Sequence, residues 1–278
     1  MKAPDFDYLR PETLAEALAM LAEHGDEAAI IAGGQSLLPL LHFRLAAPGY
    51  LIDIGRLDDL RRIIEGDGYI EIGGLVRHCD LADSAVIGRE FPLLHQAVGH
   101  IAHPGVRHRG TIGGSLAMAD PAGELGACCL ALDGQVLLQS ARGQRWVAMA
   151  DFFAGVFDTA LAGDEILTAV RLPRRGPGGI QIFNEIARRR GDFAMAGLAL
   201  VADGGLASPR LALLGVADRP VLAARTMALL ANDSRDFDGA IELIGDDVAP
   251  VEDPAYPPAY RRHLVGVLLR RALAEVPL

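Results

Sequence analysis

AGGQSLLP at residues 32–39 and RGTIGGSLAMADPAGE at residues 109–124 are the two stretches that decide the fold. The first follows a short apolar run, residues 28–32, which is typical of a buried strand. Gly33 and Gly34 then leave the backbone bare, and Ser36 stands where a helix N-cap belongs. Because the free N–H groups of a first helical turn attract anions, this stretch could hold a pyrophosphate. An ordinary tight strand-to-helix turn is the alternative.

The second stretch has three glycines within residues 110–114, together with the hydroxyls of Thr111 and Ser115. These residues predict a second group of backbone N–H donors. Asp120 is placed to cap a helix that begins at Pro121, with Glu124 one turn inside it. A glycine-rich turn is the alternative here too, but two anion-binding loops in one domain favour a dinucleotide with a diphosphate. Neither stretch is G-x-G-x-x-G, which disfavours a Rossmann NAD site.

Apolar periodicity around these stretches predicts an α+β protein with two domains. In the first part we expect helices and strands over 11–22, 28–32, 37–45, 50–54, 62–73, 77–101, 125–132, 135–138, 146–148 and 165–172. A linker rich in proline, glycine and arginine occupies 173–179. Beyond it we expect strands over 180–188, 193–202 and 209–217, then helices over 219–231, 237–246 and 257–275. The predicted domains are 1–175, with subdomains of about 1–55 and 56–175, and 176–278.

Length and composition limit the function. The chain has 278 residues, of which 51% are apolar and 22% charged, so it is long enough for two cores and too apolar for wholesale disorder. A net charge of −10 disfavours nucleic-acid and anionic-membrane partners. No apolar run approaches the ~18 residues that span a bilayer, and the N-terminus has no signal-peptide core, so we expect a cytoplasmic protein. Lys2 is the only lysine, which excludes a Walker A loop and a pyridoxal phosphate site.

Metal-binding and catalytic patterns are weak. Cys79, Cys128 and Cys129 form no C-x-x-C pair, so we expect no iron–sulfur or zinc site in this chain and interpret these cysteines as buried apolar residues. The histidines at 95, 100, 103 and 108 fit no ligand spacing, while the role of His78 stays open. We therefore expect no metal ligands and no acid, base or nucleophile among the side chains.

The two glycine stretches closely resemble the flavin-binding signatures of the FAD-binding medium subunit of molybdenum hydroxylases, the xanthine dehydrogenase and aerobic carbon monoxide dehydrogenase family. ARRRGDFAMAGLAL at 187–200 is similar to the family's R-x-G-D-[FY]-A segment, and residues 213–226 and 259–273 are similar to its C-terminal domain. The resemblance covers nearly the whole chain. It implies a PCMH-type, vanillyl-alcohol oxidase-like FAD-binding domain of two subdomains, followed by a smaller domain that combines an antiparallel sheet with helices.

The resemblance also assigns residues to the cofactor. The diphosphate and the neighbouring ribityl or ribose would lie against Ala32, Gly33, Gly34, Gln35, Ser36, Leu37, Gly110, Thr111, Gly113, Gly114 and Ser115. Ile101 would pack on FAD, Glu124 would accept a hydrogen bond from it, the backbone of Leu167 would contact the flavin, and Phe193 would lie near the isoalloxazine ring. The sequence departs from some relatives at three places. Met118 stands where they have histidine or asparagine, and Ser115 stands where they have asparagine. Some relatives also have a lysine close to the position of Asn184, which this chain lacks.

The function implied is that of a flavoprotein electron-transfer subunit. Substrate would be oxidised at a molybdopterin in a separate large subunit, and electrons would pass through the [2Fe–2S] clusters of a small subunit to FAD and on to an external acceptor. The complex would be a dimer of heterotrimers. Two alternatives are a self-sufficient flavin oxidase or reductase of the same superfamily and a flavin-free assembly subunit. The substrate and the acceptor stay open.

Overall fold

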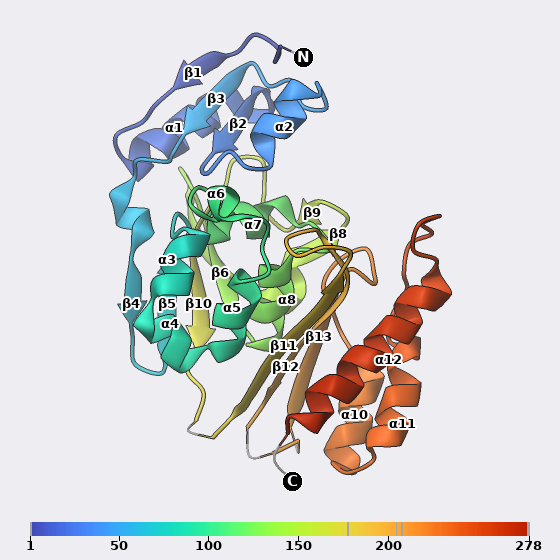
Figure 1. The fold of residues 1–278 in the computed structure, drawn as a ribbon. Helices are drawn as coiled ribbons and strands as arrows, with labels where there is room; N and C mark the ends of the chain where they lie inside the picture. Colours follow the sequence, from blue (N-terminus) through green and yellow to red (C-terminus); the bar gives the residue numbers. More distant parts are fainter. Residues whose placement is uncertain (1, 177, 204, 207, 277–278) are drawn as a thin grey trace.

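The computed structural model describes residues 2–176, 178–203, 205–206 and 208–276, so residue 177 of the predicted linker and the extreme ends of the predicted domains lie outside it. The chain begins with a parallel sheet in the order β1 (Asp7–Leu9), β3 (Tyr50–Asp53), β2 (Ala28–Ile31). Helix α1 (Leu14–His24) packs on this sheet through Ala17, Leu18 and Leu21, and α2 (Leu37–His42) follows β2 (Figure 1). The sequence patterns missed β1, which has only three residues.

A second, antiparallel sheet forms the centre of the molecule. Its strand order is β4 (Ile63–Glu65), β5 (Tyr69–Gly73), β10 (Ile166–Pro173), β6 (Gln135–Ser140), β7 (Gly143–Ala148). Strand β10 pairs with both β5 and β6, so it joins two hairpins that are distant in sequence. The helices of this part are α3 (His78–Asp83), α4 (Ala85–Glu90), α5 (Pro92–Val98), α6 (Pro104–Arg107), α7 (Ile112–Met118), α8 (Glu124–Ala131) and α9 (Met149–Phe152), and a ribbon of β8 (Phe153–Gly155) and β9 (Asp158–Thr159) follows them.

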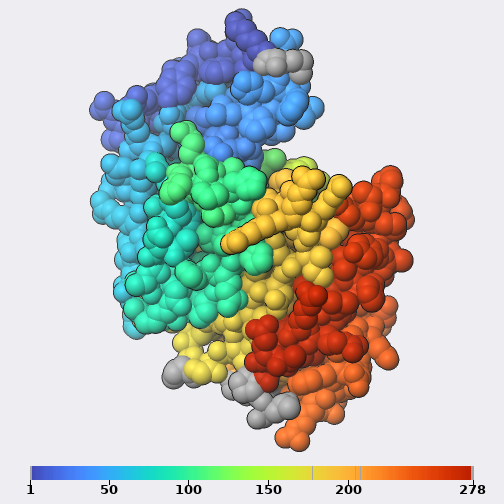
Figure 2. All heavy atoms as spheres, viewed as in Figure 1, coloured from blue at the N-terminus to red at the C-terminus, as the bar shows by residue number. Residues whose placement is uncertain are grey.

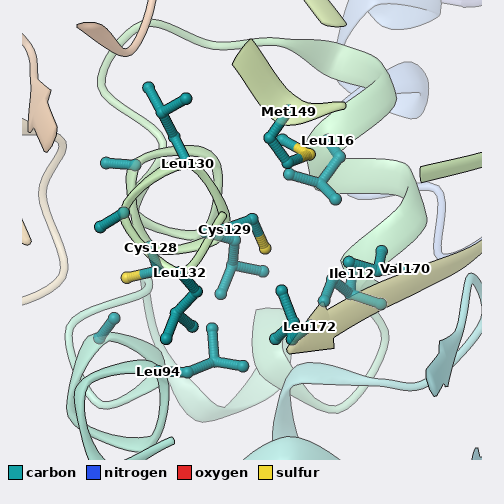
Figure 3. Close-up of a cluster of buried hydrophobic side chains, with 14 of the residues drawn as sticks. Leu94, Ile112, Leu116, Cys128, Cys129, Leu130, Leu132, Met149, Val170 and Leu172 are labelled. Atoms are coloured by element: carbon teal, nitrogen blue, oxygen red, sulfur yellow. The ribbon is translucent and has the colours of Figure 1, made fainter. Parts of the chain in front are cut away.

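Helix α8 is the buried centre of this part. Every one of its residues is buried, and Figure 3 shows Cys128 and Cys129 on it among apolar side chains that include Leu94 and Met149. Burial raises the pKa of the Cys129 thiol to about 12, which makes it an unreactive packing group. The interpretation of Cys128 and Cys129 as core residues is therefore confirmed, whereas it is wrong for Cys79 on α3, which is only partly buried.

The C-terminal part is a four-stranded antiparallel sheet of β11 (Ile180–Ala187), β12 (Ala194–Ala202), β13 (Pro209–Leu214) and β14 (Val221–Leu222). Helices α10 (Ala224–Asn232), α11 (Phe237–Leu243) and α12 (Pro258–Ala274) cover one face (Figures 1 and 2). Because side chains alternate along a strand, Phe183 enters the core around α8 while Ile182 enters the core beneath these helices. The α+β fold is thus as expected, with helices and antiparallel sheets in both parts.

Several local predictions are wrong. The helix expected over 219–231 begins only at Ala224, because Val221 and Leu222 pair with β13 as strand β14. Ser36 is the N-cap residue of α2, but its side chain makes no capping hydrogen bond because its backbone is already helical (φ −93°, ψ −45°). The helix expected from Pro121 begins at Glu124, since Asp120 Oδ1 instead accepts from the N–H of Ala122 at 2.9 Å in a turn. Strand β13 ends at Leu214 rather than at residue 217 because Gly215 has a φ of +73°.

Within the described residues, no helix is long and apolar enough to cross a bilayer.

Candidate cofactor site

A cavity of ≈ 690 Å³ lies between the N-terminal sheet, the helices α6, α7 and α8, strand β10 and the segment 191–193. Every residue that the resemblance assigned to the cofactor lines it. These residues are Ala32, Gly33, Gly34, Gln35, Ser36, Leu37, Ile101, Gly110, Thr111, Gly113, Gly114, Ser115, Glu124, Leu167 and Phe193. The fold therefore brings together residues that are up to 161 positions apart (193 − 32).

The two glycine stretches meet in one wall of the cavity. A Cβ atom built on Gly33 would lie only 2.1 Å from the carbonyl oxygen of Arg109, so the two backbones approach at a distance that only glycine allows. The Arg109 Nε atom and the Gln35 Nε2 atom both donate to the carbonyl oxygen of Gly33, at 3.4 and 3.1 Å. Gly34 has a φ of +73°, which turns the chain from β2 toward α2.

The second glycine stretch is the first turn of α7 rather than a free loop. Thr111 Oγ1 accepts from the N–H of Gly114 at 3.1 Å, which is an N-cap bond. A Cβ at Gly113 would lie 2.6 Å from the carbonyl oxygen of Gly74, and the Gly113 N–H donates to that same oxygen at 2.9 Å. Glycine at 113 thus lets α7 pack against the chain that leaves β5. The N–H groups of residues 112–115 all donate within the protein, to Val76 O, Gly74 O, Thr111 Oγ1 and Thr111 O, so the prediction that this stretch supplies free backbone donors is wrong for these four groups.

Glu124 is the acidic group of the cavity wall. Only 9% of its surface is exposed, and this burial, with a smaller contribution from the charge of Glu185, raises its pKa to about 7. Near neutral pH its carboxyl group can therefore accept a hydrogen bond as the carboxylate or donate one as the acid. Asp120 also lines the cavity, and burial raises its pKa as well.

His78 is a polar cavity residue whose role the sequence left open. It is 3% exposed, and its Nε2 atom lies 3.0 Å from Ser115 Oγ. Burial, reinforced by the charge of Arg107, lowers its pKa to about 4, against an opposing effect of the Thr111 backbone. The sequence signal for this residue is its position four residues after Gly74, where the chain leaves β5 for α3.

Two aromatic rings stand at the mouth of the cavity. Phe193 is 72% exposed and Phe157 is 55% exposed, although both line the cavity. The segment that carries Phe193 is held in place at Gly191, which has a φ of +87° and whose Cβ would meet the carbonyl oxygen of Ala102 at 2.6 Å. Exposed rings beside a cavity are suited to packing against a flat ligand or a partner surface.

The histidines at 95, 100, 103 and 108 do not converge on one point. His95 Nε2 is 3.0 Å from the carbonyl oxygen of Ala82, whereas His100 Nδ1 pairs with Glu185 Oε1 at 3.2 Å. In the part of the chain that the structure describes, no three His, Cys, Asp or Glu side chains are grouped as a metal ion would require.

Comparisons with known proteins identify the family of the chain. Residues 4–175 match the family described as FAD binding domain in molybdopterin dehydrogenase, and residues 181–276 match the CO dehydrogenase flavoprotein C-terminal domain. The 6-hydroxypseudooxynicotine dehydrogenase complex subunit alpha of Paenarthrobacter nicotinovorans is 36% identical over 99% of this chain and 95% of its own. The carbon monoxide dehydrogenase medium chain of Afipia carboxidovorans is 34% identical over 96% of this chain and 95% of its own.

A solved structure gives the same result. A chain of reconstituted CO dehydrogenase from Oligotropha carboxidovorans superimposes with a TM-score of 0.94 at 34% identity, covering 99% of this chain and 98% of that one.

The cavity fits FAD in its size and its polar groups. Its volume is in the range of sites for extended ligands, about 300–1,000 Å³. Gly33, Gly110 and Gly113 have no room for a Cβ because other parts of the chain lie against them, so these glycines allow the two stretches to pack together in the cavity wall. The exposed rings of Phe157 and Phe193 offer apolar faces at its mouth. The chain belongs to the family of FAD-binding medium subunits of molybdenum hydroxylases; it is an oxidoreductase subunit, and FAD is its cofactor.

Proposed function

We propose that this chain carries electrons from the [2Fe–2S] clusters of a partner subunit through FAD to an external acceptor, as part of a heteromeric molybdenum hydroxylase. The observation that carries the proposal is the contact between Gly33 and Arg109, which joins both glycine stretches in the wall of one cavity. Two converging segments in one wall, the second of which carries the hydroxyl of Ser115, are suited to the diphosphate of a single dinucleotide.

Different residues of the cavity wall bind different parts of the cofactor in this proposal. The segments Ala32–Leu37 and Thr111–Ser115 hold the diphosphate and the adjoining ribityl or ribose, and Glu124 accepts a hydrogen bond from the cofactor. Ile101, the Leu167 backbone and Phe193 then border the isoalloxazine ring. The domains that do this are residues 1–175, with subdomains of about 1–55 and 56–175, and residues 176–278.

The chemistry belongs to FAD, which when bound accepts electrons one at a time from iron–sulfur clusters and delivers two together to a hydride acceptor. The protein supplies binding, orientation and the electrostatic environment. Glu124 lies in the cavity wall and has a pKa near neutrality, so its protonation state tunes the charge beside the cofactor. No side chain of this chain acts as a nucleophile in the proposed role.

The proposed partners are a small [2Fe–2S] subunit and a large molybdopterin subunit, assembled as a dimer of heterotrimers. Several relatives are named as a subunit or a chain, among them the nicotine 6-hydroxylase medium subunit of Paenarthrobacter nicotinovorans.

Two measurements test the proposal. The purified chain should show a flavin absorbance spectrum with one FAD per polypeptide, and a colourless chain that takes up no added FAD would favour the flavin-free assembly subunit. Affinity purification from the native host should recover two further polypeptides, with molybdenum and iron in the complex. A lone chain that oxidises an organic substrate would instead support the self-sufficient oxidase and contradict the proposed electron path.

A further inference from the structure

His78 joins the start of α3 to the second glycine stretch at three points. Its backbone N–H donates to the carbonyl oxygen of Gly110 at 3.0 Å, and its Nε2 atom lies 3.0 Å from Ser115 Oγ. Its ring also lies against Gly110, where a Cβ would come within 2.8 Å of the ring's Cε1 and 3.0 Å of its Nδ1. The absence of a side chain at 110 therefore makes room for this imidazole.

The hydrogen bonds of the ring determine which nitrogen carries the proton. A pKa of about 4 means that the ring is neutral at physiological pH and has a single N–H. Nδ1 is buried and has no hydrogen-bond partner within 3.5 Å among the described residues, while the Thr111 backbone near the ring acts to raise the pKa of the imidazole. A buried N–H without a partner is rarer in proteins than a buried acceptor without one, which leaves Nδ1 as the bare nitrogen. The proton then lies on Nε2 and points at Ser115 Oγ.

This tautomer also fixes the polarity of Ser115. A hydroxyl has one proton to donate and two lone pairs that accept. If the His78 Nε2–H donates to Oγ, the proton of the hydroxyl stays free for another acceptor. Among the described residues, His78 is the hydrogen-bond partner of the Ser115 side chain, and Ser115 itself lines the cavity.

We propose that His78 is a positioning residue that donates its Nε2–H to Ser115 Oγ and thereby presents the Ser115 O–H to the cavity as a hydrogen-bond donor. Such a donor is suited to an anionic oxygen, and donation from His78 strengthens it because hydrogen bonds in a chain polarise one another. The identification of that anionic oxygen as the FAD diphosphate rests on the proposed function.

The tautomer is tested in the FAD-free protein by ¹⁵N NMR of histidine-labelled chain near pH 7, with the His78 signals assigned by their loss in His78→Gln. We expect a protonated Nε2 and a bare Nδ1. A protonated Nδ1, or a ring that is positively charged at neutral pH, would overturn the proposal. Because this measurement involves no flavin, its result does not depend on whether the proposed function is correct.

The effect on the ligand is tested by titrating FAD into the wild type, His78→Leu, His78→Gln, Ser115→Ala and the double variant His78→Leu/Ser115→Ala. We expect His78→Leu to weaken binding about threefold to tenfold, the size of one hydrogen bond. His78→Gln, whose amide can donate in a similar place, should recover most of this loss. In the Ser115→Ala background, His78→Leu should have almost no further effect.

Equal losses from His78→Leu in both backgrounds would show that the ring acts only by packing and would overturn the proposal. A Ser115→Ala variant with wild-type affinity for FAD would overturn the assignment of its acceptor as well. A wild-type chain that binds no FAD at all would sink the proposed function, whereas the tautomer would still be decided by NMR.

Discussion

The Cα atom of Gly33 faces the carbonyl oxygen of Arg109 so closely that a Cβ would lie 2.1 Å from that oxygen. Arg109 also contacts Gly33 through its side chain, because its Nε atom donates to the carbonyl oxygen of Gly33 at 3.4 Å. These residues belong to segments separated by 76 positions, one from the parallel sheet and one from the helical layer of the central sheet. The geometry of the cavity wall therefore depends on the absence of a side chain at residue 33.

Gly33→Ala should weaken FAD binding more than a glycine-to-alanine substitution at any other position just before α2. The added carbon meets backbone atoms, which cannot rotate away, so the two segments must separate. We expect a destabilisation of about 1–3 kcal/mol and loss of measurable FAD binding. Urea unfolding and flavin fluorescence titration measure the two effects.

Gly105→Ala is the matched control, since a Cβ at Gly105 on α6 has nothing within 4 Å. It should bind FAD as the wild type does. Full flavin stoichiometry in Gly33→Ala, or in a variant with bulky residues at both 33 and 34, would contradict the assignment of this wall to the diphosphate.

Thr111→Ala should loosen the first turn of α7. The change removes the oxygen that accepts from the Gly114 N–H, and such a cap contributes about 1 kcal/mol. We expect that loss in the free energy of unfolding, together with weaker FAD binding. Thr111→Ser keeps the accepting oxygen and should retain most of both. If the serine variant is as impaired as the alanine variant, the buried methyl group of Thr111 matters and the cap does not.

The family resemblance named residues that line one cavity in the structure, but the sequence patterns did not show how the fold brings them together. The helix and strand patterns were strong where apolar residues repeat over long runs, as in α1 and β12. They failed at Asp7–Leu9, because a three-residue strand is too short for a periodic pattern. They also did not show that β10 lies between β5 and β6, because long-range pairing leaves no local signal in the pattern.

The first turn of α7 shows why local rules misassign such segments. Glycine disfavours a helix, so residues 110–115 were interpreted as a loop or turn. In the structure, the Thr111 cap and the contact between Gly113 and Gly74 outweigh that preference and begin a helix. His78 was left open for a related reason, since its bond to Ser115 spans 37 positions and depends on this packing.

Phe193→Ala should affect the ligand and leave the fold intact. A side chain that is 72% exposed contributes little to the packed core, so the free energy of unfolding should change by less than about 0.5 kcal/mol. Loss of a ring that packs on a flat cofactor should weaken FAD binding about threefold to tenfold. Fluorescence titration and urea unfolding separate the two quantities.

Phe43→Ala is the matched control, because Phe43 is 67% exposed at the end of α2 and does not line the cavity. It should bind FAD normally. Equal FAD affinity in the two variants would show that Phe193 does not contact the cofactor. Its exposed ring would then be a candidate contact for a partner protein.

Glu124→Gln should change how stability depends on pH. The folded chain raises the pKa of this carboxyl from 4.5 to about 7, mainly by burial. Between these values the folded state holds a proton that the unfolded state has lost, so this group's contribution is complete below pH 4.5 and disappears as the pH rises through about 7. Glutamine is neutral at every pH and lacks this dependence.

The FAD-free wild type should therefore lose stability relative to Glu124→Gln between pH 4.5 and pH 8, by on the order of 2–3 kcal/mol. Urea unfolding of both proteins at several pH values measures the difference. His78 has the opposite sign, because its lowered pKa removes stability as the pH falls from 6.5 toward 4. It is present in both proteins, so its effect cancels in the comparison. Glu23→Gln changes an exposed residue on α1, and its free energy of unfolding should depend on pH as that of the wild type does. If the pH dependence of Glu124→Gln is also the same as that of the wild type, the prediction for Glu124 is wrong.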